Sequence, residues 1–138
     1  MSMTISEKIL ARAAGRSSVR AGEFVWARVD QTNAGASELR LLDELGVTKL
    51  AAPETVWATS DHYAPATDEH YANQDNLLRK YVRHYGITNF FEYGRHGIAH
   101  QLFGEHGAML PGTLSAMSDS HSTSGGVFNC FATPIGTE

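Results

Sequence analysis

The sequence predicts an α/β fold, in which a mainly parallel β-sheet is flanked by helices. Two observations favour this class. Segments typical of strands alternate along the chain with segments typical of helices, which is the order of a parallel sheet covered by helices. Polar side chains also follow the predicted strands, at the place where open α/β sheets bind ligands. A chain of 138 residues is long enough for one such domain with a real core.

The first half of the chain predicts two helices and two strands. Residues 4–7 form a Thr-Ile-Ser-Glu capping box that opens a helix, and Gly15 ends it. A strand is expected at residues 24–29. Ser37 is then expected to cap a leucine-rich helix, and residues 55–59 predict the second strand.

The second half continues the alternation. A longer helix begins near Thr67 and carries an apolar face as far as Gly86. Residues 88–92 predict a third strand, and residues 113–117 predict a fourth after a Pro-Gly turn. The polar residues that follow these strands are expected at one edge of the sheet: Asp30, Asp61, His62, Glu92, Arg95, His96, Asp119, Ser120 and His121.

Residues 118–126 hold a carboxylate, several hydroxyls, an imidazole and two glycines between a strand and a predicted helix. Backbone N–H groups at a helix start favour anions, and a histidine beside an aspartate can move a proton near neutral pH. The segment therefore indicates an anionic substrate undergoing acid–base chemistry. The alternative is a turn in which Asp119 and a serine only cap the helix.

The chain contains seven histidines, of which few are expected to be functional. His62 stands out because it follows Asp61 at a strand end. His96 and His100 are four residues apart, a spacing that could bind a metal on a helix, but the intervening Gly97 disfavours that helix. Three others are expected at the surface: His70, His84 and His106.

Composition excludes several classes of function. A net charge of −4 without basic runs argues against a nucleic-acid partner. The sequence shows no bilayer-spanning stretch and no signal peptide, so no membrane is expected. The single Cys130 excludes an internal disulfide framework and favours a cytoplasmic setting. Without repeats or linkers, residues 1–138 are expected to form one domain.

Several motifs resemble, in order, those of the aconitase family. They are Asp61-His62 with Pro65, residues 85–94, Gly97-Ile98 with His100-Gln101, Pro111-Gly112, and Asp119-Ser120-His121 ahead of Gly125-Gly126. The opening segments look closest to the large subunits of 3-isopropylmalate dehydratase and homoaconitase; these are residues 7–11 with Gly15, Gly22-Glu23 and Val29-Asp30. The resemblance concerns the amino-terminal part of such a subunit, so an incomplete α/β/α domain is expected.

The resemblance implies a hydro-lyase that dehydrates a hydroxylated di- or tricarboxylic acid of the 3-isopropylmalate type and rehydrates it. The implied cofactor is a 4Fe-4S cluster, whose ligand cysteines this chain lacks. The implied base is a serine on a swivelling domain or on a small subunit, so the partner is that small subunit or the remaining large-subunit domains. We expect the isolated chain to hold no cluster and to be inactive.

The resemblance also implies roles for individual residues. His62, with Asp61 as its carboxylate partner, would protonate the leaving hydroxyl. His100 and Asp119 would pair across the site, and His121 would be a third histidine. The remaining residues would bind the substrate: Ser120, Ser122 and Arg95.

Two other readings stay open. One is a hydrolase with Zn or Mn ligands from His62, His96, His100, Asp119 and His121. The other is a non-catalytic module that binds a carboxylate or assembles with a partner. Cys130, in a predicted helix, is expected to be a core residue rather than a cluster ligand.

Overall fold

The computed structural model describes residues 2–95 and 97–136, and in them five strands form one parallel sheet of order β3-β2-β1-β4-β5. The strands are β1 (Gln31–Asn33), β2 (Val56–Thr59), β3 (Asn89–Phe91), β4 (Leu114–Met117) and β5 (Phe131–Pro134). The predicted α/β class with a parallel sheet is confirmed. The second, third and fourth predicted strands correspond to β2, β3 and β4.

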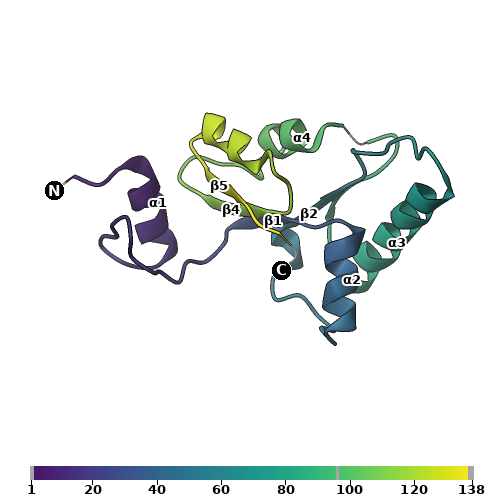
Figure 1. Ribbon diagram of the computed structural model, residues 1–138, viewed down its shortest axis with the longest axis horizontal. Coiled ribbons are helices and arrows are strands. Elements are labelled where there is room, and N and C mark those ends of the chain that lie inside the picture. The colour runs from purple at the N-terminus through teal and green to yellow at the C-terminus, as the bar shows by residue number, and fades with distance from the viewer. Residues whose placement is uncertain (1, 96, 137–138) are drawn as a thin grey trace.

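Helices cover both faces of the sheet (Figure 1). They are α1 (Ile5–Ala13), α2 (Ala36–Glu44), α3 (Glu69–Tyr85) and α4 (Ala99–Glu105), with short 3-10 helices η1 (Pro53–Thr55) and η2 (Ser122–Phe128). Alternate residues of β2 face two cores: Val56 and Ala58 pack with α2 and α3, whereas Trp57 packs with α4. The result is three layers.

The helix ends follow the capping signals of the sequence. In α1, Thr4 accepts from the Glu7 N–H at 3.2 Å and Glu7 accepts from the Thr4 N–H at 2.7 Å, so the predicted capping box is confirmed. Gly86 ends α3 at a φ of +70°, a conformation that costs glycine little. The cap of α2 is Gly35 rather than the predicted Ser37, because the Glu38 carboxylate accepts from the Gly35 N–H at 2.9 Å.

The first strand lies later in the chain than predicted. Residues 24–29 are outside the sheet, and Gln31–Asn33 is the strand because Thr32 pairs with Val56 on one side and with Ala116 on the other. Long-range pairing has overridden the stronger strand propensity of residues 24–29. Asp30 therefore precedes β1, at the opposite edge of the sheet from the one expected.

Asp30 joins three segments at that amino edge. Its carboxylate accepts from the Leu114 N–H at 2.8 Å, and its own N–H donates to the Leu114 carbonyl at 2.8 Å. Arg12 of α1 also donates to the Asp30 carboxylate. Burial opposes ionisation, but the Leu114 and Arg12 interactions outweigh it and hold the pKa of Asp30 below its usual value.

Cys130 is a buried core residue, as expected, but the predicted helix around it is wrong. It lies between η2 and β5, and only 5% of it is exposed. Its thiol donates to the Ser115 hydroxyl at 3.4 Å and accepts from the Thr113 hydroxyl at 3.3 Å. The helix before it is a 3-10 helix pressed onto β5: a Cβ at Gly125 would lie 2.7 Å from that of Ala132.

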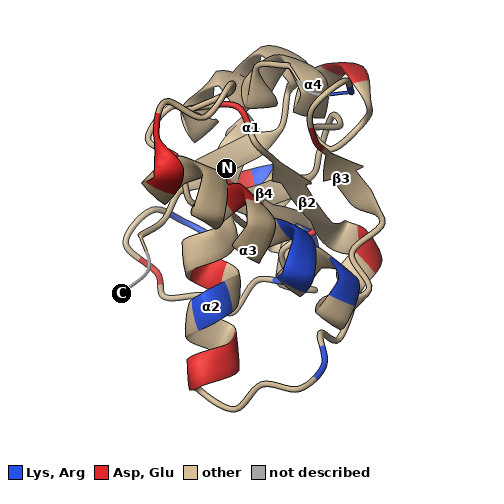
Figure 2. Ribbon diagram, turned by 90° about the vertical axis from the view of Figure 1, so that its right-hand side faces the viewer, with Lys and Arg blue, Asp and Glu red and all other residues tan. Residues whose placement is uncertain are grey.

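Charges of both signs lie along α2 (Figure 2), whereas in α3 the acidic Glu69 and Asp75 precede the basic Arg79, Lys80 and Arg83. Within the described part of the chain, no helix is long and apolar enough to cross a membrane.

Candidate functional site

A crevice lies at the carboxyl ends of β1 and β4, where the strand order reverses. The chain leaves β1 for α2 on one face of the sheet and leaves β4 for η2 on the other, so the two connections diverge. Ligands of open α/β sheets bind at such a switch point. The Ser118 N–H donates to the Asn33 side chain at 2.7 Å and ties the two strand ends together.

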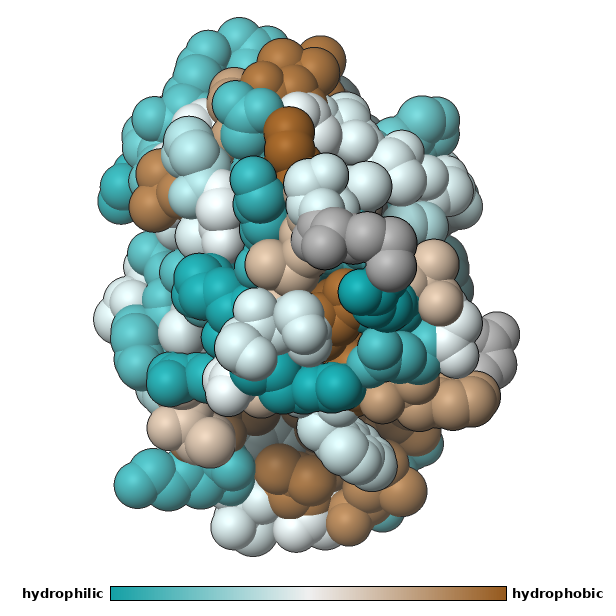
Figure 3. Space-filling model, turned by 90° about the vertical axis from the view of Figure 1, so that its left-hand side faces the viewer, coloured by the Kyte–Doolittle hydropathy of each residue, from teal (hydrophilic) through white to brown (hydrophobic). Residues whose placement is uncertain are grey.

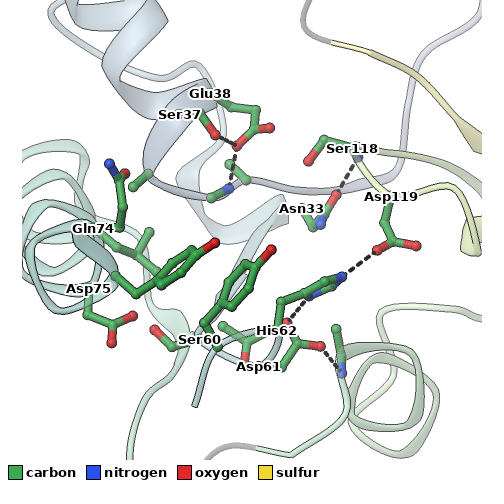
Figure 4. A pocket seen from close by; sticks show the side chains of 18 of the residues that line it. Asn33, Ser37, Glu38, Ser60, Asp61, His62, Gln74, Asp75, Ser118 and Asp119 are labelled. Atoms are coloured by element: carbon green, nitrogen blue, oxygen red, sulfur yellow. Dashed lines mark hydrogen bonds and ion pairs between the residues drawn. The ribbon is translucent and has the colours of Figure 1, made fainter. Parts of the chain in front are cut away.

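A cavity of about 600 Å³ occupies this position. Its walls come from the segments after β1, β2 and β4, from α2 and α3, and from the start of α4 (Figure 4). Of the predicted catalytic residues, four line it: Asp61, His62, His100 and Asp119. The structure thus brings together side chains up to 58 positions apart in the sequence, from Asp61 to Asp119.

Asp61 orients His62. One Asp61 oxygen accepts from the Ala99 N–H at 2.9 Å, at the start of α4, and the other lies 2.7 Å from His62 Nδ1. The second ring nitrogen, Nε2, lies 3.2 Å from an oxygen of Asp119. Because each nitrogen faces a carboxylate oxygen, the arrangement suits the doubly protonated imidazolium. The hydrogen bond and charge of Asp61 raise the pKa of His62; burial opposes this rise and Asp119 adds to it.

Asp119 is the centre of the polar network. One of its oxygens faces His62, and the other lies 3.0 Å from His100 Nε2 and accepts from the His121 N–H at 2.6 Å. Burial disfavours the ionised carboxylate, but the His121 N–H and the two imidazoles outweigh burial and lower the pKa of Asp119. An ionised Asp119 therefore connects His62 to His100.

The other predicted site residues are placed less centrally. The His121 ring is 80% exposed at the rim and its Nδ1 lies 3.2 Å from the Ser120 hydroxyl. Ser122 is fully buried and donates its hydroxyl to the Asp119 carbonyl at 2.5 Å, so it shapes the loop. Arg95 is exposed and does not line the cavity. His96 lies outside the described residues.

The site offers one set of metal ligands within the part of the chain that the structure describes. Nitrogen and oxygen atoms of His100, Asp119 and His121 all lie within 4.8 Å of one another. A 4Fe-4S cluster does not fit these residues, because its ligands are cysteine thiolates. The only cysteine of the chain, Cys130, is buried beside β5 and does not line the cavity.

Sequence reasoning missed part of the cavity wall. Tyr63 and Tyr71 stack with their ring centroids 3.6 Å apart, and both line the cavity. Glu38 and Gln74 line it as well, from α2 and α3 (Figure 4). The position of Tyr63 directly after Asp61-His62 was a usable signal. Tyr71 and Gln74 carried none, because polar residues in the first turns of a helix look like ordinary surface.

The sequence matches the model of the Aconitase family (aconitate hydratase) over residues 17–138. Among curated proteins it is 41% identical to the 3-isopropylmalate dehydratase large subunit of Moorella thermoacetica, over 99% of this chain and 34% of that subunit. It is 37% identical to the large subunit of Aquifex aeolicus and 40% identical to that of Mycolicibacterium smegmatis, over 99% of this chain and 32% of each relative. The chain thus spans about a third of the length of these relatives. It belongs to the aconitase family.

Proposed function

We propose that this chain supplies the histidine–aspartate part of a hydro-lyase active site. The enzyme removes water from a hydroxylated di- or tricarboxylic acid of the 3-isopropylmalate type and adds water back. Family membership and the names of the relatives support the reaction class. The observation that carries the proposal is the position of His62, between the carboxylates of Asp61 and Asp119 at the carboxyl edge of the sheet.

His62 is the proposed general acid. Hydroxide is a poor leaving group, and a proton delivered to its oxygen as the C–O bond breaks lets it depart as water. The raised pKa favours the protonated form of the His62 ring, and 63% of its side chain is exposed to solvent at the cavity. Asp61 holds the ring in place through Nδ1, and the proton on Nε2, which faces Asp119 at 3.2 Å, is the one delivered to the leaving oxygen.

Asp119 has two proposed tasks. It stabilises the charged ring of His62, and it links that ring to His100 through the two oxygens of one carboxylate. A proton lost from His62 can be replaced along this connection. In the reverse reaction, His62 accepts a proton from the incoming water.

The proposed substrate is anionic, and groups at the rim suit its carboxylates. The Ser120 hydroxyl and the exposed ring of His121 lie next to Asp119 and can donate hydrogen bonds to a carboxylate. Arg95 remains a predicted contact, as does Ser122, whose hydroxyl is occupied by the Asp119 carbonyl.

The reaction also needs a base that removes the proton next to a substrate carboxylate. The family resemblance implies a serine on a swivelling domain or on a small subunit. We therefore propose, as the partner of this chain, the domain or small subunit that carries this serine. The family's 4Fe-4S cluster requires cysteines beyond the single one of this chain.

A chimeric subunit tests the proposal. This chain replaces the matched third of the Moorella thermoacetica large subunit, and the chimera is assembled anaerobically with the small subunit of that enzyme. Dehydration of 3-isopropylmalate is followed by absorbance of the alkene product. We expect the chimera to turn over substrate and the isolated chain to show no turnover. In the chimera, His62→Gln should lower kcat by about 10²-fold or more.

Arg83 provides the control, because it is an exposed residue of α3 that does not line the cavity. Arg83→Gln should leave turnover unchanged. A chimera whose turnover survives His62→Gln would show that His62 is not the acid.

A further inference from the structure

The segment of residues 20–29, named here the aromatic arm, connects α1 to β1 and presents two aromatic side chains to solvent. Phe24 is 103% exposed and Trp26 is 97% exposed relative to an extended chain. Such full exposure of two large apolar side chains is unusual, because they bury large areas when they pack. Figure 3 views the end of the molecule formed by α1 and the arm, where hydrophobic side chains gather at the lower margin among hydrophilic ones.

The arm has the geometry of a strand without a partner strand. Exposure alternates along it: Phe24, Trp26 and Arg28 are exposed, whereas Val25 and Ala27 are half-buried. A period of two is the signature of an extended strand with one covered face. Among the described residues, no backbone hydrogen bond involves the N–H or carbonyl groups of residues 24–27.

The ends of the arm are nevertheless held. The Arg28 N–H donates to the Ala13 carbonyl at 2.9 Å, and Arg16 pairs with Glu23 at 2.8 Å. The segment between these anchors is therefore positioned as a strand before any partner arrives. A pre-positioned strand with free N–H and carbonyl groups is a template for strand addition.

We infer that the aromatic arm pairs with a β-strand from the part of the large-subunit polypeptide that this chain does not match. The chain accounts for 34% of the Moorella thermoacetica subunit, so about two-thirds of that polypeptide is available to supply a strand that covers the arm. The incoming strand satisfies the backbone groups of residues 24–27, and its apolar side chains bury Phe24 and Trp26. The inference rests on the proposed function only in that both place this chain in the same assembly.

Hydrogen exchange tests the inference in the isolated chain and in the chimera described above. The amides of residues 24–27 should exchange rapidly in the isolated chain and about tenfold or more slowly in the chimera. The double substitution F24S/W26S should abolish this protection. Leu45→Ser is the matched control, because Leu45 is a 70% exposed apolar residue at the end of α2 and should not affect the arm.

Each outcome decides between the two proposals. Turnover of the chimera without protection of residues 24–27 overturns the inference and leaves the proposed function standing. Protection of residues 24–27 in a chimera that shows no turnover supports the inference and overturns the proposed function. Protection that appears in the isolated chain as its concentration rises, with a doubled mass in solution, identifies a second copy as the occupant and overturns the inference. A chimera that does not fold also counts against it, because the arm has then failed to accept its partner.

Discussion

Asp30 and Asp119 are the same residue type at opposite edges of one sheet, and their partners give them different roles. Asp30 precedes β1 at the amino edge and bonds Arg12 and the Leu114 N–H. Asp119 follows β4 at the carboxyl edge and meets His62, His100 and the His121 N–H. In both, backbone and cationic partners outweigh burial and lower the pKa.

The difference lies in what the partners can do. An arginine guanidinium keeps its charge at every working pH, so Asp30 and Arg12 form a permanent link between α1 and the sheet. Imidazoles gain and lose protons near neutral pH, so the charge that faces Asp119 can change during a reaction. In this chain, the carboxylate at the candidate site is the one whose partners can titrate.

The largest effect separating the two residues should be on catalysis. Asp119→Asn keeps an oxygen that can accept from the His121 N–H but removes the charge between His62 and His100. In the chimera, we expect kcat to fall by about 10²-fold or more, measured as formation of the alkene product. Asp30→Asn is the matched control and should leave kcat near the parent value. Equal losses of kcat in Asp119→Asn and Asp30→Asn would show that the two carboxylates do not differ in their role in catalysis.

The second effect should be on stability, and here Asp30 is the sensitive residue. Asp30→Ala leaves the Leu114 N–H without its side-chain acceptor, and Leu114 is only 5% exposed. We expect the free energy of unfolding to fall by about 1–3 kcal/mol, measured by urea denaturation of the 138-residue chain. Arg12→Gln should cost less, because half of the Arg12 side chain is exposed. An unchanged midpoint for Asp30→Ala would contradict the assigned link.

The third effect concerns the titration of His62. Its pKa should lie above the ordinary value of 6.5, chiefly because of the adjacent Asp61. Proton NMR of the ring should show this pKa falling in Asp61→Asn, and falling less in Asp119→Asn. Asp30→Asn, at the opposite edge of the sheet, is the control variant and should leave the pKa of His62 unchanged. If the pKa of His62 is unchanged in Asp61→Asn, Asp61 does not raise it, and the basis for proposing His62 as the general acid is lost.

The smallest effects should appear as changes of stability with pH, and their signs are opposite. A lowered carboxylate pKa stabilises the fold above the unfolded value of 3.8, and this contribution is lost as the pH falls through the folded value. The raised pKa of His62 stabilises the fold below 6.5, and this contribution is lost as the pH rises through the folded value. Urea midpoints against pH should therefore fall at both ends. In the plot of urea midpoint against pH, Asp30→Asn should reduce the fall at acid pH, and His62→Gln should reduce the fall near neutral pH.

Local signals predicted most of the fold. The capping box at Thr4 and the glycine after Tyr85 specify helix ends through contacts within a few residues, so the sequence contains them. Local signals did not predict the first strand correctly, since Gln31–Asn33 is polar and becomes a strand only through its neighbours β2 and β4. The fifth strand, β5, was also missed, because the segment around Cys130 was predicted to be helical.

The members of the candidate site were predictable in part, and the contacts between them were not. Asp61, His62, His100 and Asp119 carried motif signals, and the cavity contains all four. The contact of His62 Nε2 with Asp119 depends on how the loops after β2 and β4 approach each other, which local pattern does not encode. Tyr71, the stacking partner of Tyr63, was hidden because a residue in the first turn of a helix looks like ordinary surface.

The pairing of β1 with β4 also has a consequence for how the chain folds. These neighbouring strands are separated by 84 positions, as between Gln31 and Ser115, and everything between them must be looped out before they meet. Loop closure over such a distance is slow relative to helix formation. During synthesis, α2, β2 and α3 can assemble while β4 is still being made, and the edge that carries Asp119 forms afterwards. Until then the centre of the sheet is open along one side of β1, and an unpaired strand edge of this kind is prone to aggregation.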